Sequence, residues 1–440
     1  MRTYRVRCKV ILLISEAEAS SQGIEADMRN KLELPRLSLQ ERDRRWSTVR
    51  EEMKQQGLDC LVLCGFPGQW DFTLANARFL SPIAGNAEFN FLIFPAEGEP
   101  TSFVLMPTFL QYWARAQDWV KDIRPRRGTW AGSVVSRLKE LGLEKKRIGV
   151  DGLAGPLDPD GWFPSSVYTS LLKLVPGATF VNTNDMMERI RMVKSLEEID
   201  FLRKAAHLGD LMLETCVQAS KPGVRECEVY GKMVEVMLGN GGEEPTLFLW
   251  TSDAHLLPHP FRLPTMRPLE KGDMIICEMH PKYGGYCTHL ERTFCLGEPE
   301  KEYLEIYEGC LAAYTRGMDL FMPGTKITEA MNDVKEVIGG KKLGFCEAGI
   351  HGHGLSSLEY PRYRHHAPGA DAKALELAGD EFKPGMVFAF NIDLVNPAWR
   401  KGETGCVFAE TVLVTEGKPE RLHGFSTDFQ IIGKNSKVND

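Results

Sequence analysis

The segment spanning residues 271–295 constrains the fold of this chain more than any other stretch. It begins with a Gly-Asp turn, and an apolar run follows over residues 274–277. A Tyr-Gly-Gly sequence at 283–285 supplies a second turn, and the chain returns through another largely apolar stretch. Two apolar runs on either side of a glycine-rich turn predict a β-hairpin.

Four polar side chains distinguish this hairpin from an ordinary solvated one. Glu278 and His280 are two residues apart and project from one face of the first strand, whereas His289 and Glu291 share a face of the second. If the two faces coincide, two carboxylates and two imidazoles converge. Because buried charges persist only when they are paired or bound to metal, this composition indicates a functional site.

The hairpin and its surroundings resemble the metal-binding hairpin of the pita-bread family, metallopeptidase M24, which includes creatinase, aminopeptidase P, prolidase and methionine aminopeptidase. The resemblance is carried by the Gly-Asp turn, the ligand position five residues later, and the Arg292-Thr293-Phe294 ending of the second strand. Other segments follow in the family's order, and an ordered set is far more specific than one motif: residues 191–199, 259–260, 352–354, 384–388 and 411–416. The resemblance implies an α+β fold, in which a smaller α/β creatinase-like domain precedes a pita-bread catalytic domain.

The family's metal ligands are not retained in this chain. Its peptidases hold two metals on Asp, Asp, His, Glu and Glu, and the corresponding positions here are Glu278, His289, His353, Asn391 and Ala409. Alanine cannot bind a metal, and the asparagine offers only a neutral amide. We therefore do not expect the two-metal centre of an Xaa-Pro dipeptidase.

The sequence Glu-Arg-Thr at 291–293 has the form found in creatinase, which works without metal. The resemblance then implies that Glu291 binds a cationic, guanidinium-like group and that His259 is the catalytic acid/base. Tyr360 stands where the family usually has a second histidine and would assist catalysis as a hydroxyl donor. We also expect Arg262 to bind a substrate carboxylate and Asn391 to contact the substrate.

A second interpretation comes from the residues themselves. Glu278, His280, His289 and His353 supply one carboxylate and three imidazoles, which suit a single Zn, Fe or Mn ion with an open coordination position. A dimethylsulfoniopropionate lyase of the same fold also takes a ligand from the place of His280. His351 is the alternative to His353 at the metal-ligand position, because a small slip of the loop would exchange them. If His353 is the ligand, we expect His351 to bind the substrate. The single-metal site and the metal-free site remain alternatives.

The most direct functional prediction is an enzyme that cleaves a bond in a small polar metabolite, most simply by hydrolysis of a C–N bond. A lyase would use the same parts. Ala409 and Asn391 favour a pseudoenzyme that acts as a binding module. However, simple loss of the metal site would not explain why Glu and His replace both hairpin aspartates. An intact Xaa-Pro dipeptidase is disfavoured because its two-metal chemistry needs the missing carboxylates.

Composition limits the other classes of function. A chain of 440 residues with net charge −7 and 43% hydrophobic residues predicts two domains and no basic surface for nucleic acid. Eleven cysteines without C-x-x-C pairs near histidines indicate reduced thiols and a cytoplasmic protein. No apolar run is long enough to span a bilayer, so we expect no membrane partner. The resemblance implies a homodimer that acts on a small molecule.

Four segments are expected along the chain. Residues 1–35 form an amino-terminal extension. Alternatively, the start is misassigned and the true start is Met28. Residues 36–185 form the creatinase-like α/β domain, 186–434 the pita-bread domain and 435–440 a tail. In relatives the first domain lends residues to the cleft of the other subunit, and Trp70, Phe72 and Phe89 are candidates for that role.

Overall fold

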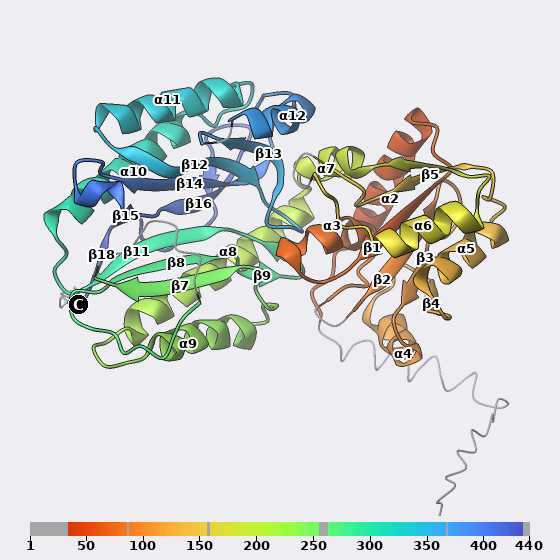
Figure 1. The fold of residues 1–440 in the computed structure, drawn as a ribbon, viewed down its shortest axis with the longest axis horizontal. Coiled ribbons are helices and arrows are strands. Elements are labelled where there is room, and N and C mark those ends of the chain that lie inside the picture. The colour runs from red at the N-terminus through yellow and green to blue at the C-terminus, as the bar shows by residue number, and fades with distance from the viewer. Residues whose placement is uncertain (1–33, 86–87, 156–158, 255–262, 367, 434–440) are drawn as a thin grey trace, which may run out of the picture.

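The computed structural model describes residues 34–85, 88–155, 159–254, 263–366 and 368–433. These residues form two lobes, an amino-terminal α/β lobe and a larger carboxy-terminal lobe (Figure 1). The expected extension therefore lies almost wholly outside the described residues, as do the tail, His259 and Arg262. No helix of the described residues is long and apolar enough to cross a membrane.

The amino-terminal lobe is built on a mixed sheet. Its central strand β1 (Cys60–Gly65) is wholly buried because helices cover both faces of an almost uninterrupted apolar run. In the described residues this sheet has the order β4-β3-β2-β1-β5-β6, with β2 (Asn90–Pro95), β3 (Thr101–Val104), β4 (Asp122–Pro125), β5 (Arg147–Val150) and β6 (Thr179–Asn182). The helical segments of this lobe are α2 (Leu39–Gln55), η1 (Gln69–Asp71), α3 (Phe72–Leu80), α4 (Pro107–Ala116), α5 (Trp130–Glu140), α6 (Ser165–Leu174) and α7 (Asn184–Met192).

The carboxy-terminal lobe is a large curved sheet flanked by two helix pairs. Within the described part of the chain the order is β13-β12-β14-β16-β11-β8-β7, and three short strands, β15, β17 and β18, pair at its sides. Figure 1 shows α8 and α9 on one side of the lobe and α10 and α11 on the other. The strands are β7 (Phe248–Asp253), β8 (Met274–Met279), β11 (Leu290–Leu296), β12 (Gly344–Gly352), β13 (Glu359–Arg364), β14 (Val387–Val395), β15 (Gly405–Cys406), β16 (Ala409–Leu413), β17 (Glu420–Arg421) and β18 (Gln430–Ile432), and the helices are α8 (Leu196–Ala219), α9 (Glu226–Gly239), α10 (Lys301–Leu320), α11 (Ile327–Gly340) and α12 (Pro368–Ala378). This α+β architecture agrees with the expected fold class.

The predicted hairpin is formed by β8 and β11, with a short extension of β9 (Lys282–Tyr283) and β10 (Tyr286–Cys287) at its tip. Gly284 and Gly285 form its two-residue turn and have φ angles of 56° and 88°, which a glycine adopts without steric cost. Glu278 lies directly opposite Glu291 in the register of β8 and β11. The two polar faces predicted from the sequence therefore coincide.

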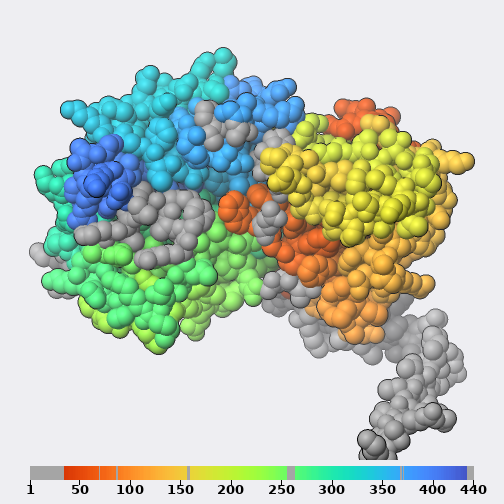
Figure 2. Space-filling view, viewed as in Figure 1, coloured from red at the N-terminus to blue at the C-terminus, as the bar shows by residue number. Residues whose placement is uncertain are grey.

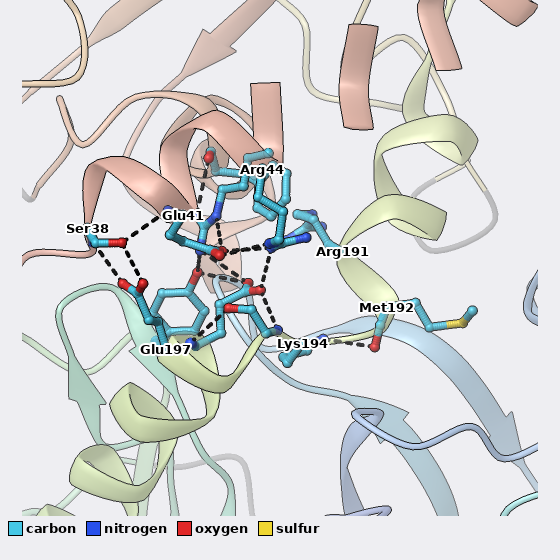
Figure 3. A network of polar contacts seen from close by, with 12 residues as sticks. Ser38, Glu41, Arg44, Arg191, Met192, Lys194 and Glu197 are labelled. Carbon is cyan, nitrogen blue, oxygen red and sulfur yellow. Dashed lines mark hydrogen bonds and ion pairs between the residues drawn. The ribbon is translucent and has the colours of Figure 1, made fainter. Parts of the chain in front are cut away.

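A buried polar network joins the two lobes (Figure 3). Arg45 of α2 donates to the Glu41 carboxylate at 2.7 Å and to the Tyr286 hydroxyl at 2.6 Å, and that hydroxyl donates to Glu198 at 3.0 Å. Arg45 is 1% exposed, so its charge depends on these carboxylates. Tyr286 lies at the tip of the hairpin, and the network therefore ties α2 to the strands that carry the polar residues.

We predict that Arg45→Met lowers the free energy of unfolding by about 3 kcal/mol, because it removes the buried counter-ion of Glu41 and Glu198 and leaves them only the partly exposed Arg44. Chemical denaturation followed by circular dichroism measures this loss. The matched control is Arg203→Met, which breaks the exposed pair with Glu420 and should cost less than about 1 kcal/mol. Equal effects of the two substitutions would contradict a structural role for the network.

Candidate functional site

Three imidazoles converge where β8 and β11 meet the tip of the hairpin. His280 directly follows β8, His289 directly precedes β11, and His353 directly follows β12. One ring nitrogen from each lies within 4.8 Å of the others, and all three side chains are buried. The hairpin thus supplies two donors and a separate strand supplies the third.

Hydrogen bonds orient two of these rings. The Nδ1 atom of His280 lies 2.7 Å from the Ser357 hydroxyl, and Nδ1 of His353 lies 3.7 Å from the Cys287 sulfur. Within the part of the chain that the structure describes, neither ring's Nε2 has a hydrogen-bond partner. Buried polar atoms are normally satisfied, so these two nitrogens are well suited to bind a metal ion.

Burial favours the neutral form of His280, His351 and His353. It lowers the pKa of His280 and of His353 well below the usual value, with the neighbouring His351 adding to the effect. Burial and the Arg362 guanidinium lower the pKa of His351 to about 3. Neutral imidazole is the form that binds metal, so the site needs no deprotonation near neutral pH.

Carboxylates lie beside the imidazole cluster. Glu278 and Glu291 form a second close group with His289, whose Nε2 lies 3.2 Å from a Glu291 oxygen. Asp393 of β14 is hydrogen-bonded to Glu291. Burial and the charges of Glu347 and Glu278 raise the pKa of Asp393 well above its usual value, so this carboxyl favours its protonated form.

The cluster opens into a cavity of about 360 Å³. Glu278, His280, His289, His351 and Asn391 line its inner wall, and Arg362, Arg364 and Glu347 also line it. The guanidinium groups of both arginines lie within 3.3 Å of the Asp371 carboxylate. The remaining wall includes Trp70, which comes from the amino-terminal lobe. A cavity of this size and polarity suits a small polar molecule.

The structure distributes the predicted site residues unevenly. His280, His289 and His353 lie together, whereas Glu278 is grouped with His289 and Glu291. Glu291 is fully buried beside His289, and the residues lining the cavity do not include it. His351 and Asn391 both line the cavity, and their role in substrate binding stays a prediction.

Tyr360 does not lie in the cavity. Its ring is fully buried in the apolar core of the carboxy-terminal lobe, and its hydroxyl points to Asp185 at 3.5 Å. The resemblance placed Tyr360 at the family's second-histidine position, but the residues that line this cavity do not include it. We therefore correct the prediction and omit Tyr360 from the site.

Sequence reasoning missed several residues of the site. Asp393 follows Asn391 by two positions on one strand, and that alternation could have revealed it. Ser357, Arg362 and Trp70 come from segments whose approach depends on tertiary packing, so no local pattern identifies them. Trp70 was one of three candidates for the cleft of a second subunit, and it lines the cavity of its own chain.

Two family comparisons cover most of the chain. Residues 200–416 match the model described as metallopeptidase family M24, and residues 45–193 match the creatinase/prolidase N-terminal domain.

Individual relatives agree with these matches. The chain is 29% identical over 247 residues to an Xaa-Pro dipeptidase of Pyrococcus furiosus, a match that covers 55% of this chain and 66% of that protein. It is 23% identical over 412 residues to a creatinase of a Bacillus species, covering 89% and 92% of the two chains. The solved structure of an Xaa-Pro dipeptidase from Bacillus anthracis has a TM-score of 0.70 at 22% identity, covering 89% of this chain and 99% of that one. This structural likeness shows the fold.

We predict that the protein purified without a histidine tag holds about one Zn, Fe or Mn ion per chain, and that His289→Ala loses it. The expected loss follows because His289 belongs to the three-imidazole group. Elemental analysis measures the metal per chain. His207→Ala is the control, because His207 lies on the exposed side of α8. Equal metal content in the two variants would argue against the site.

We predict that acid destabilises the metal-stripped protein partly through His351. Its folded-state pKa is about 3, below the usual 6.5, so the unfolded chain binds more protons between these values and stability falls as pH falls through this range. His351→Gln should remove a slope of about 1.4 kcal/mol per pH unit from the free energy of unfolding below pH 6. Urea denaturation at several pH values tests this, with His207→Gln as the control, and an unchanged slope would contradict it.

Proposed function

Because the chain belongs to metallopeptidase family M24, a family of hydrolases, we propose that it hydrolyses a C–N bond in a small polar metabolite within the 360 Å³ cavity. A divalent transition ion, Zn, Fe or Mn, would be held by His280, His289 and His353. One observation carries this proposal. The Nε2 atoms of His280 and His353 are buried and, among the described residues, have no hydrogen-bond partner.

A cation bound to these imidazoles would polarise the substrate or lower the pKa of a bound water. The donor set fits one ion and does not fit the family's two-metal centre. Asn391 and Ala409 are directly paired, and Ala409 is also paired with Glu291, so an alanine occupies a position where that centre requires a carboxylate.

The chain's own residues have distinct roles in this proposal. Glu278, at the cavity wall, binds the cationic part of the substrate. Glu291, whose carboxylate lies 3.2 Å from Nε2 of His289, would help to hold that ring in place. Asn391 and His351 contact the substrate. On the resemblance alone, His259 carries the proton and Arg262 binds a substrate carboxylate.

The competing functions have weaker support from the geometry. An Xaa-Pro dipeptidase would need the carboxylates that Ala409 and Asn391 replace. A pseudoenzyme would not require neutral imidazoles beside a cavity. A metal-free creatinase-like enzyme would bind its substrate cation at the Glu278 wall, and a lyase would use the same residues. By analogy with the family, we also propose a cytoplasmic homodimer.

We predict that the purified enzyme releases urea or an amine from guanidino or amidino compounds more rapidly than it hydrolyses proline dipeptides. Glu278→Gln should lower kcat/KM by about 100-fold or more because it removes the charge that holds the substrate cation. The control is Glu336→Gln, on the exposed face of α11. Proline dipeptides as the preferred substrates would overturn the proposed substrate class, and unchanged kinetics in Glu278→Gln would overturn the role of that residue.

A further inference from the structure

The amino-terminal lobe contributes one aromatic side chain to the catalytic cavity of its own chain. Trp70 lines the same cavity as Glu278, His280 and Asn391, which all belong to the carboxy-terminal lobe. It lies in η1, immediately before α3, and Figure 1 shows α3 at the junction of the lobes. Figure 2 shows the red-orange residues of this lobe set against green and blue residues of the other.

The backbone at this position is unusual. Trp70 and Asp71 have φ angles of 57° and 63°, which lie in the left-handed region. Consecutive non-glycine residues rarely adopt this conformation, and for a bulky side chain it persists only when surrounding contacts enforce it. The turn is therefore held in place by the structure around it.

A buried ion pair supplies one such contact. The Asp71 carboxylate lies 2.7 Å from the Lys282 ammonium group, and both side chains are buried. Lys282 belongs to β9 at the tip of the hairpin. The η1 turn is thus attached to the element that carries His280 and His289.

Ser357 supplies a second contact and connects the turn to the imidazole cluster. Its backbone N–H donates to the Trp70 carbonyl at 3.0 Å, while its hydroxyl lies 2.7 Å from Nδ1 of His280. A single residue therefore touches both the Trp70 turn and a proposed metal ligand. Movement of the turn would therefore displace Ser357 and, with it, the His280 ring.

We propose that Trp70 is a specificity-determining residue, whose indole packs against a planar cationic group of the substrate while Glu278 provides the opposite charge. An aromatic face and a carboxylate in one cavity are the chemistry that recognises a guanidinium or amidinium group. Asp71 is a positioning residue that holds the indole in place through Lys282. The inference rests on the proposed hydrolase function, because it concerns the substrate of the same cavity.

The test compares Trp70→Ala, Trp70→Phe and Asp71→Asn with the wild type. Isothermal titration with guanidinoacetate, creatine and alanyl-proline measures binding, and release of urea or amine measures turnover. We expect Trp70→Ala to weaken binding of the guanidino compounds roughly tenfold, Trp70→Phe to restore most of it and Asp71→Asn to weaken it several-fold. Trp130→Phe is the control, because Trp130 lies in α5 and does not line the cavity.

Metal content is measured in every variant and should stay at the wild-type value in Trp70→Ala, which separates loss of specificity from collapse of the site. Binding that depends on Trp70 without any turnover would support the inference while overturning the proposed reaction. Turnover of guanidino compounds that is unchanged in Trp70→Ala would overturn the inference and leave the reaction standing. A wild-type protein that binds none of the three probes would overturn both.

Discussion

The register between β8 and β11 is the constraint on which the site depends. Glu278 opposes Glu291, and a slip of one residue would turn one strand's polar side chains away from the other's. The two-residue turn at Gly284 and Gly285 permits only a narrow range of pairings. A local turn therefore determines which nitrogen and oxygen atoms meet in the interior of the lobe.

The hairpin and a few polar residues could be predicted from the sequence because both depend on local spacing. Alternation along a strand placed Glu278 and His280 on one face, and the glycine turn brought His289 opposite them. Tyr360 was predicted from its position in the family pattern and not from alternation, and its side chain enters the apolar core. Trp70 was a candidate for a cleft, but only tertiary structure shows which one, since its turn is attached to a lysine 211 positions from Asp71.

The change of donors also changes the electrostatics of the site. Two carboxylates directly opposite one another on adjacent strands repel when both are charged. The family's ligand set places five acidic or imidazole donors around two cations, whereas this chain has His289 and Asn391 in place of two acids and Ala409 in place of a third. At these five ligand positions, fewer acidic donors require less positive charge to balance them, which is consistent with one metal ion rather than two.

Buried polar side chains of the two lobes pair with one another, and this pairing links the stability of the lobes. Lys282 and Tyr286 belong to the hairpin tip, yet their polar partners Asp71 and Arg45 lie in the amino-terminal lobe. Separation of the lobes would expose these charges or leave them buried without partners, which costs more than the loss of an ordinary surface contact. Because the same tip precedes the proposed metal ligand His289, displacement of the amino-terminal lobe would also disturb the imidazole cluster. The amino-terminal lobe is therefore a structural part of the proposed site.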